Sequence, residues 1–245
     1  MTDEEKGIVV LYGGGIDSTT LLGHLATDPE GITDPKGIYQ LAPNDIHVVH
    51  FDYGQKASVY ERACAYYFAE LFGVVNRGSG KPNVYGISVD PFIFGSSDIM
   101  KDAGRLSDTP SRNVVEGRNL LFIAHAAVLA SKLGVANVAV GFHHEPEGAP
   151  FPDASRLFLS SVNHTMRAGM NHPVGIIAPF KYLTRKGIFK AALKIHADIL
   201  TKAHTCYEAV SGGCGKCAHC VTKAQLLDEI SQEDAYLALR ARVDL

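Results

Sequence analysis

Five short apolar runs that alternate with stretches of helical character constrain the fold of this 245-residue chain more than any other feature. Runs rich in β-branched residues and bounded by turn residues predict buried strands, which we place at residues 7–12, 46–51, 84–89, 137–140 and 175–178. Alternating strands and helices form a mainly parallel sheet joined by right-handed crossovers. We therefore expect an α/β, Rossmann-like fold, with a five-stranded parallel sheet and helices on both of its faces.

Helices are expected between these strands and after them. The first starts near Ser18, and others follow at residues 56–72, 119–133, 153–170, 184–196 and, as one helix or as two that divide near Ser231, 221–242. Residues 28–44, with three prolines, suggest an irregular insertion, and residues 92–115 suggest loops and short helices. We expect an α/β domain at residues 1–200 and a C-terminal zinc-binding helical module at residues 201–245.

Charge and hydropathy exclude several classes of function. Twenty-three basic residues against 26 acidic ones give a net charge of −3, which offers no electrostatic basis for direct binding of nucleic acid. The first residues lack the layout of a signal peptide. The most apolar stretch, residues 120–130, is shorter than the roughly 20 residues that a membrane span needs. We therefore expect a cytoplasmic protein without a membrane partner.

A glycine-rich segment joins the first expected strand to the first expected helix. Glycines let backbone amides approach an oxyanion, and the helix N-terminus adds partial positive charge. The segment therefore predicts a phosphate-binding loop, although a turn whose serine or aspartate only caps the helix would use the same residues. It matches neither Walker A nor G-x-G-x-x-G, and a carboxylate here suits a magnesium ion or a loop-positioning role. The candidate residues are Tyr12, Gly13, Gly14, Gly15, Ile16, Asp17, Ser18 and Thr19.

This segment resembles the pyrophosphate loop of the N-type ATP pyrophosphatases, whose pattern is Ser-Gly-Gly-x-Asp-Ser. Gly14, Gly15, Asp17 and Ser18 match the pattern, whereas Gly13 stands where the family has its first serine, so one hydroxyl donor is missing. The resemblance implies that the loop binds ATP and that Asp17 and Ser18 are catalytic. It also implies that a carboxyl or carbonyl oxygen is activated as an adenylate with release of pyrophosphate.

Four of the five cysteines fall within fifteen residues, at Cys206, Cys214, Cys217 and Cys220. Four thiolates are the number that a closed tetrahedral zinc site needs, and such a site is structural because no position remains for water. A cluster without metal and an iron–sulfur centre are the alternatives. We expect zinc, with His219 exposed to solvent and the fifth cysteine, Cys64, in the core.

Together, the glycine loop and the cysteine cluster resemble the QueC family of 7-cyano-7-deazaguanine synthases over residues 8–224. The supporting segments are residues 51–55, 116–119, 152–156, 178–186 and 205–207. The resemblance implies that 7-carboxy-7-deazaguanine is adenylated, that ammonia gives the amide, and that a second ATP drives dehydration to the nitrile preQ0. It also implies Mg²⁺ with ATP and structural Zn²⁺, and homodimers are common in this family.

The resemblance assigns further residues to ATP and substrate. Asp52, Tyr53 and Gly117 are assigned to the ATP site, where Asp52 accepts hydrogen bonds and Tyr53 stacks on a base. Arg118 opens a helix and can hold a carboxylate or phosphate in bidentate fashion, and Asn119 is assigned to the substrate beside it. From the residues alone, an ordinary turn, a surface salt bridge and an N-cap asparagine explain the same positions.

Two further pairs are candidates. Arg185 or Lys186 is expected to neutralise the leaving pyrophosphate, while the other is a solvated cation on a helix face. Asp153 and Arg156 are expected to contact the heterocycle, and a structural ion pair on one helix face is the alternative.

The loop after the fourth expected strand, residues 142–146, departs from the QueC pattern. His143 in this loop is expected to contact substrate, and a second metal site that includes His144 is the alternative. Glu116 stands in place of a proline, and Ala154 stands in place of a cysteine, with Ser155 as an extra residue. We expect an altered pocket beside a retained adenylation loop and zinc module.

Three alternatives in function remain open. A QueC-like enzyme could transfer the activated deazaguanine carboxylate to another amine, including one on a protein, and stop at the amide. A tRNA-modifying member of the superfamily would need a basic surface, which the net charge of −3 does not suggest. A non-catalytic nucleotide-binding relative is the third alternative, and Gly13 is its main support.

Overall fold

The computed structural model describes residues 7–27, 41–95, 97–104, 113–143, 152–172 and 174–243. Five strands form one sheet: β1 (Ile8–Tyr12), β2 (Ile46–Asp52), β3 (Val84–Ser88), β4 (Asn137–Ala139) and β5 (Gly175–Ile177). They pair in parallel throughout, in the order β3-β2-β1-β4-β5. The expected five-stranded parallel sheet is confirmed.

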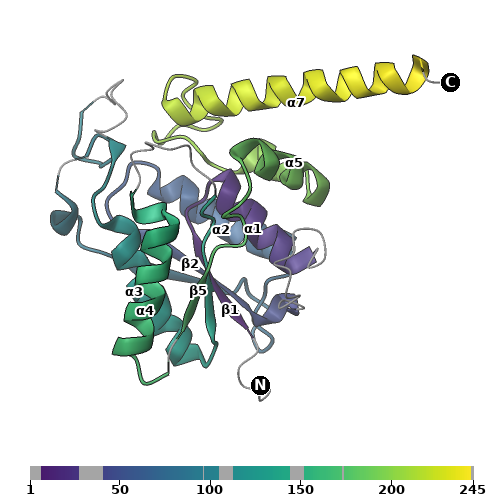
Figure 1. Cartoon of the computed structure of the whole chain (residues 1–245). Coiled ribbons are helices and arrows are strands. Elements are labelled where there is room, and N and C mark those ends of the chain that lie inside the picture. Colours follow the sequence, from purple (N-terminus) through teal and green to yellow (C-terminus); the bar gives the residue numbers. More distant parts are fainter. Residues whose placement is uncertain are drawn as a thin grey trace.

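Helices cover both faces of this sheet (Figure 1). On one face lie α1 (Ile16–Thr27), α2 (Ser58–Leu71) and α5 (Arg185–Ile195), and on the other lie α3 (Arg118–Leu133) and α4 (Arg156–Gly169). Successive side chains of a strand point to opposite faces. Ile8 and Val10 of β1 therefore join the core beneath α1, whereas Val9 joins the core beneath α3. Because both faces are covered, β1 is a continuous apolar run.

Helix α1 begins at Ile16, earlier than the expected start near Ser18, so Asp17 and Ser18 both lie in its first turn. The N–H and the hydroxyl of Thr19 both donate to the carbonyl oxygen of Gly15, at 3.0 and 2.8 Å, and these bonds close the turn. The glycine loop therefore leads directly into the end of the helix where the partial positive charge is greatest.

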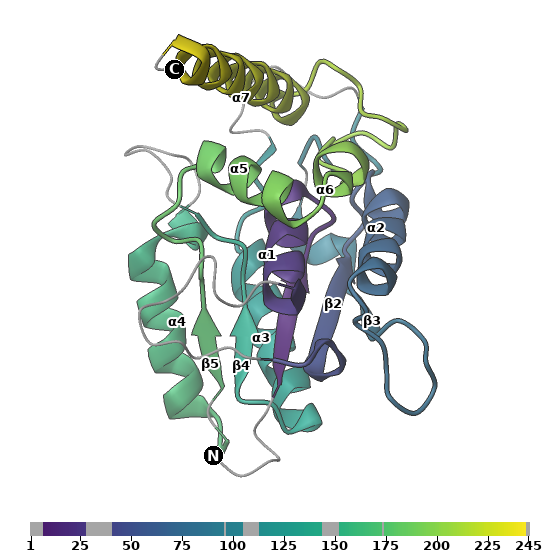
Figure 2. The same ribbon diagram turned by 90° about the vertical axis from the view of Figure 1, so that its right-hand side faces the viewer.

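Helix α7 (Ala218–Val243) is one continuous helix, so the division that we allowed near Ser231 does not occur. The Ser231 hydroxyl donates to the carbonyl oxygen of Leu227 at 2.9 Å, a bond that a helix interior accommodates. α7 lies across α5 and extends beyond the α/β body (Figures 1 and 2). Leu226, Leu227 and Ile230 pack its first half against the core of that body.

The short helix α6 (Asp198–Lys202) contains the position at which we expected the α/β domain to end. Cys64 is buried beneath it, with its thiol 3.4 Å from the Lys202 carbonyl oxygen, as expected for a core residue.

Of the two segments that we expected to be irregular, residues 28–40, 96 and 105–112 lie outside the described residues. Within the described residues, no helix is long and apolar enough to cross a membrane.

Candidate active site

A cavity of about 330 Å³ lies where the strands of the sheet end. β1 leads into the glycine loop, β4 leads into Gly141, Phe142 and His143, and both segments line the cavity. Strand order reverses between β1 and β4, and ligands of open α/β sheets bind at such a switch point. A Cβ atom at Gly141 would come within 3.2 Å of the Ser18 nitrogen, so the loop after β4 packs closely against the start of α1.

The first two glycines of the loop are under different constraints. Gly14 has a φ of +77°, and a Cβ atom there would lie 2.7 Å from the Cα of Glu61. Its carbonyl oxygen accepts a hydrogen bond of 2.9 Å from the N–H of His204. Gly13 has no positive φ, and a Cβ atom at this position meets no atom within 4 Å. Of these two glycines, local geometry requires only Gly14.

The hydroxyl groups of the loop differ in direction. Ser18 lines the cavity, where its Oγ accepts a bond of 3.3 Å from the N–H of Gly13 and donates to the carbonyl oxygen of Gly15 at 3.2 Å. Thr19 is fully buried, and its hydroxyl bonds to that of Tyr12 at 2.8 Å. The Thr19 hydroxyl therefore points into the core and away from the cavity, because the helix face that carries it covers the sheet. The assignment of Thr19 to the ATP site stays a prediction.

Asp17, His143 and Arg185 meet at the edge of this loop. Nε2 of His143 lies 3.6 Å from Oδ2 of Asp17 and 3.3 Å from Nη2 of Arg185. These side chains come from α1, from the loop after β4 and from the first turn of α5, and all three line the cavity. The structure therefore brings together an acid, an imidazole and a guanidinium that we had predicted separately. His144 of the alternative second metal site lies outside the described residues.

Besides Gly14 and Thr19 of the loop, five residues that we assigned to ATP or substrate do not line the cavity that the described residues form: Asp52, Gly117, Asp153, Arg156 and Lys186. Asp52 accepts a bond of 3.1 Å from the N–H of Gly54, and Lys101 lies 3.7 Å away. Lys186 pairs with Glu229 and Glu233 of α7. The guanidinium of Arg156 lies over the Tyr182 ring, 5.8 Å from its centre.

Asn119 lines the cavity. Asp153, which does not line it, forms two hydrogen bonds to Asn119. The carboxylate of Asp153 accepts a bond of 3.3 Å from the backbone N–H of Asn119, and its carbonyl oxygen accepts one of 3.4 Å from the Asn119 amide. Gly117, with a φ of +71°, is the N-cap of α3. Asn119 is thus inside the first turn of α3 and is not its N-cap.

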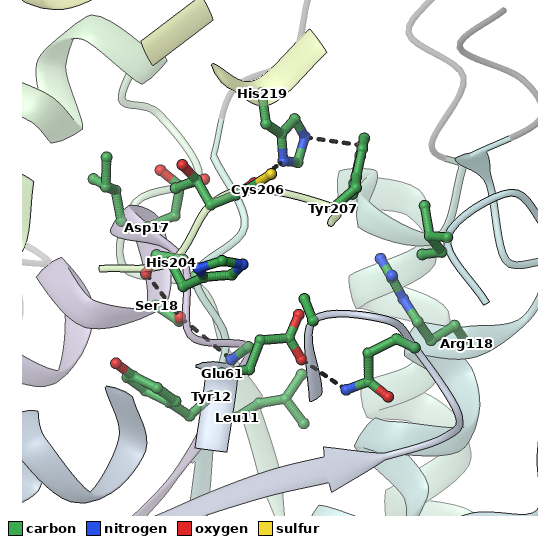
Figure 3. Close-up of a pocket in the computed structure, with 18 of the residues that line it drawn as sticks. Leu11, Tyr12, Asp17, Ser18, Glu61, Arg118, His204, Cys206, Tyr207 and His219 are labelled. Carbon is green, nitrogen blue, oxygen red and sulfur yellow. Dashed lines mark hydrogen bonds between the residues drawn. The ribbon is translucent and has the colours of Figure 1, made fainter. Parts of the chain in front are cut away.

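A hydrogen-bonded network that we did not predict adjoins the glycine loop and Arg118 (Figure 3). Gln55 donates to Oε2 of Glu61 at 2.7 Å, and Arg118 donates to the Tyr53 hydroxyl at 3.1 Å. Burial raises the pKa of Glu61 to about 7, against the effects of the Gln55 hydrogen bond and the Arg118 charge. Tyr53 is 5% exposed and packs against Phe94, so its ring is a wall of the cavity and offers no open face for a base to stack on.

The four cysteines of the predicted metal site come together. Their sulfur atoms all lie within 4.8 Å of one another, and those of Cys206 and Cys217 are 4.0 Å apart. Zn–S bonds of about 2.3 Å in a tetrahedron place sulfur atoms about 3.8 Å apart, so the set fits one metal ion of that size. Against the effect of burial, the N–H groups of Lys216 and Cys217 lower the pKa of Cys214 to about 7. The cluster could therefore hold a metal ion.

The cysteine cluster also adjoins the cavity, because Cys206, Tyr207 and His219 line it. The ring nitrogens of His219 bond to the Tyr207 hydroxyl at 3.0 Å and the Thr205 carbonyl oxygen at 3.1 Å. Burial, followed by the charge of Arg185, lowers the pKa of His219 to about 4, so the ring is neutral. The expectation of a solvent-exposed His219 is wrong, because the first turn of α7 lies against the cavity.

Comparison with known proteins identifies the family to which the chain belongs. A family model described as "Queuosine biosynthesis protein QueC" matches residues 7–231. The chain belongs to the QueC family. Membership of the QueC family supports an ATP-using enzyme with a small-molecule substrate.

The solved structures that are similar to this QueC-family chain include one at low identity. It is the U34-tRNA thiolase NcsA from Methanococcus maripaludis with its [4Fe-4S] cluster. The TM-score is 0.45 and the identity 10%, over 95% of this chain and 69% of that chain. We draw no conclusion about function from a similarity this distant.

The sequence pattern could have pointed to Glu61 as a residue of this QueC-family site, although we did not predict it. Ser58, Ala65 and Phe68 lie on the buried face of α2 at helical spacing, and Glu61 falls on the same stripe. A carboxylate on an otherwise inward-facing stripe is unusual, because burial disfavours its charge. His219 carried no comparable signal, since its position depends on how α7 packs.

Proposed function

We propose that this chain is an ATP-dependent 7-cyano-7-deazaguanine synthase, which converts 7-carboxy-7-deazaguanine to the nitrile preQ0. The observation that carries the proposal is one cavity lined by both the glycine loop and Arg118. The loop offers backbone amides, the Ser18 hydroxyl and a helix N-terminus to phosphate groups. Arg118 offers a guanidinium to a carboxylate. Adenylation of a carboxylate requires these two ligands to meet in one place.

In the first step, a carboxylate oxygen of the substrate attacks the α-phosphorus of ATP, and pyrophosphate leaves. Arg185 and the loop amides would stabilise the charge on the leaving pyrophosphate. Asp17 would position the loop and the magnesium ion that accompanies ATP. Asn119, held by Asp153, would help to orient the heterocycle.

In the second step, ammonia attacks the acyl carbon, and AMP leaves with the electrons of the broken C–O bond. The product is the amide. A second ATP then activates the amide oxygen as an adenylate. Loss of that oxygen with AMP, and of both amide protons, leaves the nitrile.

We propose structural zinc for the four-cysteine site. In a four-iron cluster each thiolate binds a different iron atom, so the sulfur atoms lie farther apart than around a single ion. Sulfur atoms that all lie within 4.8 Å of one another favour the single ion. Four thiolates leave no position for water, so the metal would fix the chain that carries Tyr207 and His219 rather than take part in the chemistry.

Ala154 favours a second candidate function. It lines the cavity at the position where the QueC pattern has a cysteine, and Gly13 leaves open space where the pattern has a serine. An altered pocket would suit transfer of the activated deazaguanine carboxylate to another amine, including one on a protein. The product would then remain an amide.

Product analysis tests the proposal and separates the two candidates. Incubated with ATP, Mg²⁺, 7-carboxy-7-deazaguanine and ammonium, the wild-type protein is expected to form AMP, pyrophosphate and preQ0, detected by mass spectrometry. AMP and pyrophosphate without the nitrile would favour the second candidate, and absence of AMP would contradict both. Ser18→Ala serves as the matched variant, and we expect it to lower turnover by at least about 10-fold, because one preorganised donor is lost.

A further inference from the structure

Glu61 lies in the cavity between the glycine loop and Arg118 (Figure 3). Its Cα lies 2.7 Å and its Cβ 2.9 Å from the position that a Cβ atom would take on Gly14. In the proposed function the phosphates of ATP lie on the loop and the substrate carboxylate lies at Arg118. The acyl carbon therefore has to lie between them, beside the carboxylate of Glu61.

The carboxylate of Glu61 is held in a fixed direction by Gln55. The amide nitrogen of Gln55 donates to the carbonyl oxygen of Phe51 at 2.8 Å as well as to Oε2 of Glu61. Its amide oxygen accepts a bond of 2.9 Å from the N–H of Tyr53. Because both ends of the Gln55 amide are occupied, it cannot turn over. Within the described part of the chain, Oε1 of Glu61 has no hydrogen-bond partner and remains available to a ligand.

We propose that Glu61 is the general base that accepts a proton from the attacking amine when AMP is displaced. This inference rests on the proposed function. As the new N–C bond forms, the C–O bond to the phosphate breaks, and AMP leaves with that electron pair. One N–H proton passes from nitrogen to Oε1 of Glu61, which becomes a neutral carboxylic acid. The step is the same for ammonia and for a primary amine, since both carry an N–H proton that must be lost.

The surroundings of Glu61 suit this role. Burial raises its pKa to about 7, Arg118 of α3 lowers the pKa, and Asp52 of β2 raises it. The charge of Glu61 also acts on Tyr12, Tyr53 and Cys64, but burial raises the pKa of all three, so all three are neutral. A general base works best when its pKa is near the operating pH. Glu61 is therefore ionised in part before the step and can hold the proton after it.

Other groups in the cavity are less suited to this step. Asp17 lies against His143, which in turn contacts Arg185, on the phosphate side of the cavity. Both ring nitrogens of His219 are engaged. His50 has a buried Nε2 without a partner among the described residues, but burial lowers its pKa, which makes it a weaker base.

Two half-reactions measured separately test the proposal. Adenylation is followed as substrate-dependent ATP–pyrophosphate exchange, and amide formation as AMP release and product mass with ammonium. For Glu61→Gln we expect exchange within about 2-fold of wild type and amide formation slower by about 100-fold, the usual size of a general-base effect. Hydroxylamine, whose adduct loses its proton more readily, is expected to restore much of the lost rate. Glu70→Gln, at an exposed position on the same helix, is the control and should match wild type in both assays.

The pH profile gives an independent readout. At constant free ammonia, the wild-type amide step is expected to rise with pH and level off above about 7, because only ionised Glu61 accepts the proton. Glu61→Gln should lose this inflection. Three outcomes would each overturn the proposal. Glu61→Gln could lose exchange together with amide formation, or it could retain both. Alternatively, His50→Gln could lose the amide step while Glu61→Gln is unaffected. Wild-type protein without exchange would overturn the proposed function itself, and this inference with it.

Discussion

At the scale of single residues, Gly13 and Gly14 are chemically identical neighbours with different constraints. A side chain at Gly13 meets open space, whereas one at Gly14 would meet the backbone of Glu61 at a positive φ. We predict that Gly13→Ser folds normally and lowers the KM for ATP by up to about 10-fold, because a hydroxyl can add one hydrogen bond to a charged phosphate. Initial rates at varied ATP concentration, with a thermal melt, measure this effect.

Gly14→Ser is the matched variant for that prediction. Its backbone would be strained and its Cβ cannot be accommodated without moving α2, so we expect a lower melting temperature and loss of activity. A higher KM for ATP in Gly13→Ser would contradict the prediction. It would show that a ligand group occupies the open space at position 13, so that a hydroxyl there does not act as an added phosphate donor.

At the scale of elements, α5 begins with two consecutive cations, and the helix decides which one reaches the cavity. Successive residues on a helix point roughly 100° apart, so Arg185 lines the cavity while Lys186 pairs with α7. We predict that Arg185→Met lowers turnover by about 100-fold, because the charge beside the leaving pyrophosphate is lost, and that Lys186→Met retains most of the turnover. Steady-state AMP release measures both, and equal losses would contradict this assignment.

At the scale of the whole molecule, the cysteine cluster joins α7 to the wall of the cavity. We predict that Cys217→Ser loses its metal and unfolds or aggregates, because metal binding supplies folding free energy, about 10 kcal/mol or more for structural zinc. Elemental analysis and scanning fluorimetry measure this, and the visible absorption spectrum separates zinc from iron. Cys64→Ser, which changes a cysteine outside the cluster, should retain the metal. A soluble, active and metal-free Cys217→Ser protein would refute the prediction.

Some features of this protein follow from the sequence because they depend on local spacing. Runs of apolar residues of strand length predicted all five strands, and the glycines after residue 12 predicted the sharp turn into α1. Spacings of two and seven residues between cysteines predicted four thiols that now lie close enough to share a metal ion. Each of these signals is complete within a short segment.

Tertiary structure decided which side chains meet in the cavity. The rotation of α5 selected Arg185 over Lys186, and the packing of α1 on the sheet turned Thr19 into the core. The position of α2 against Gly14 brought Glu61 beside the loop, and the first turn of α7 brought His219 to the cavity. The sequence determined the sheet, the loop and the cysteine cluster because those depend on neighbours along the chain. Only the tertiary structure decided which charges share the cavity, because that depends on how packed helices are rotated about their axes.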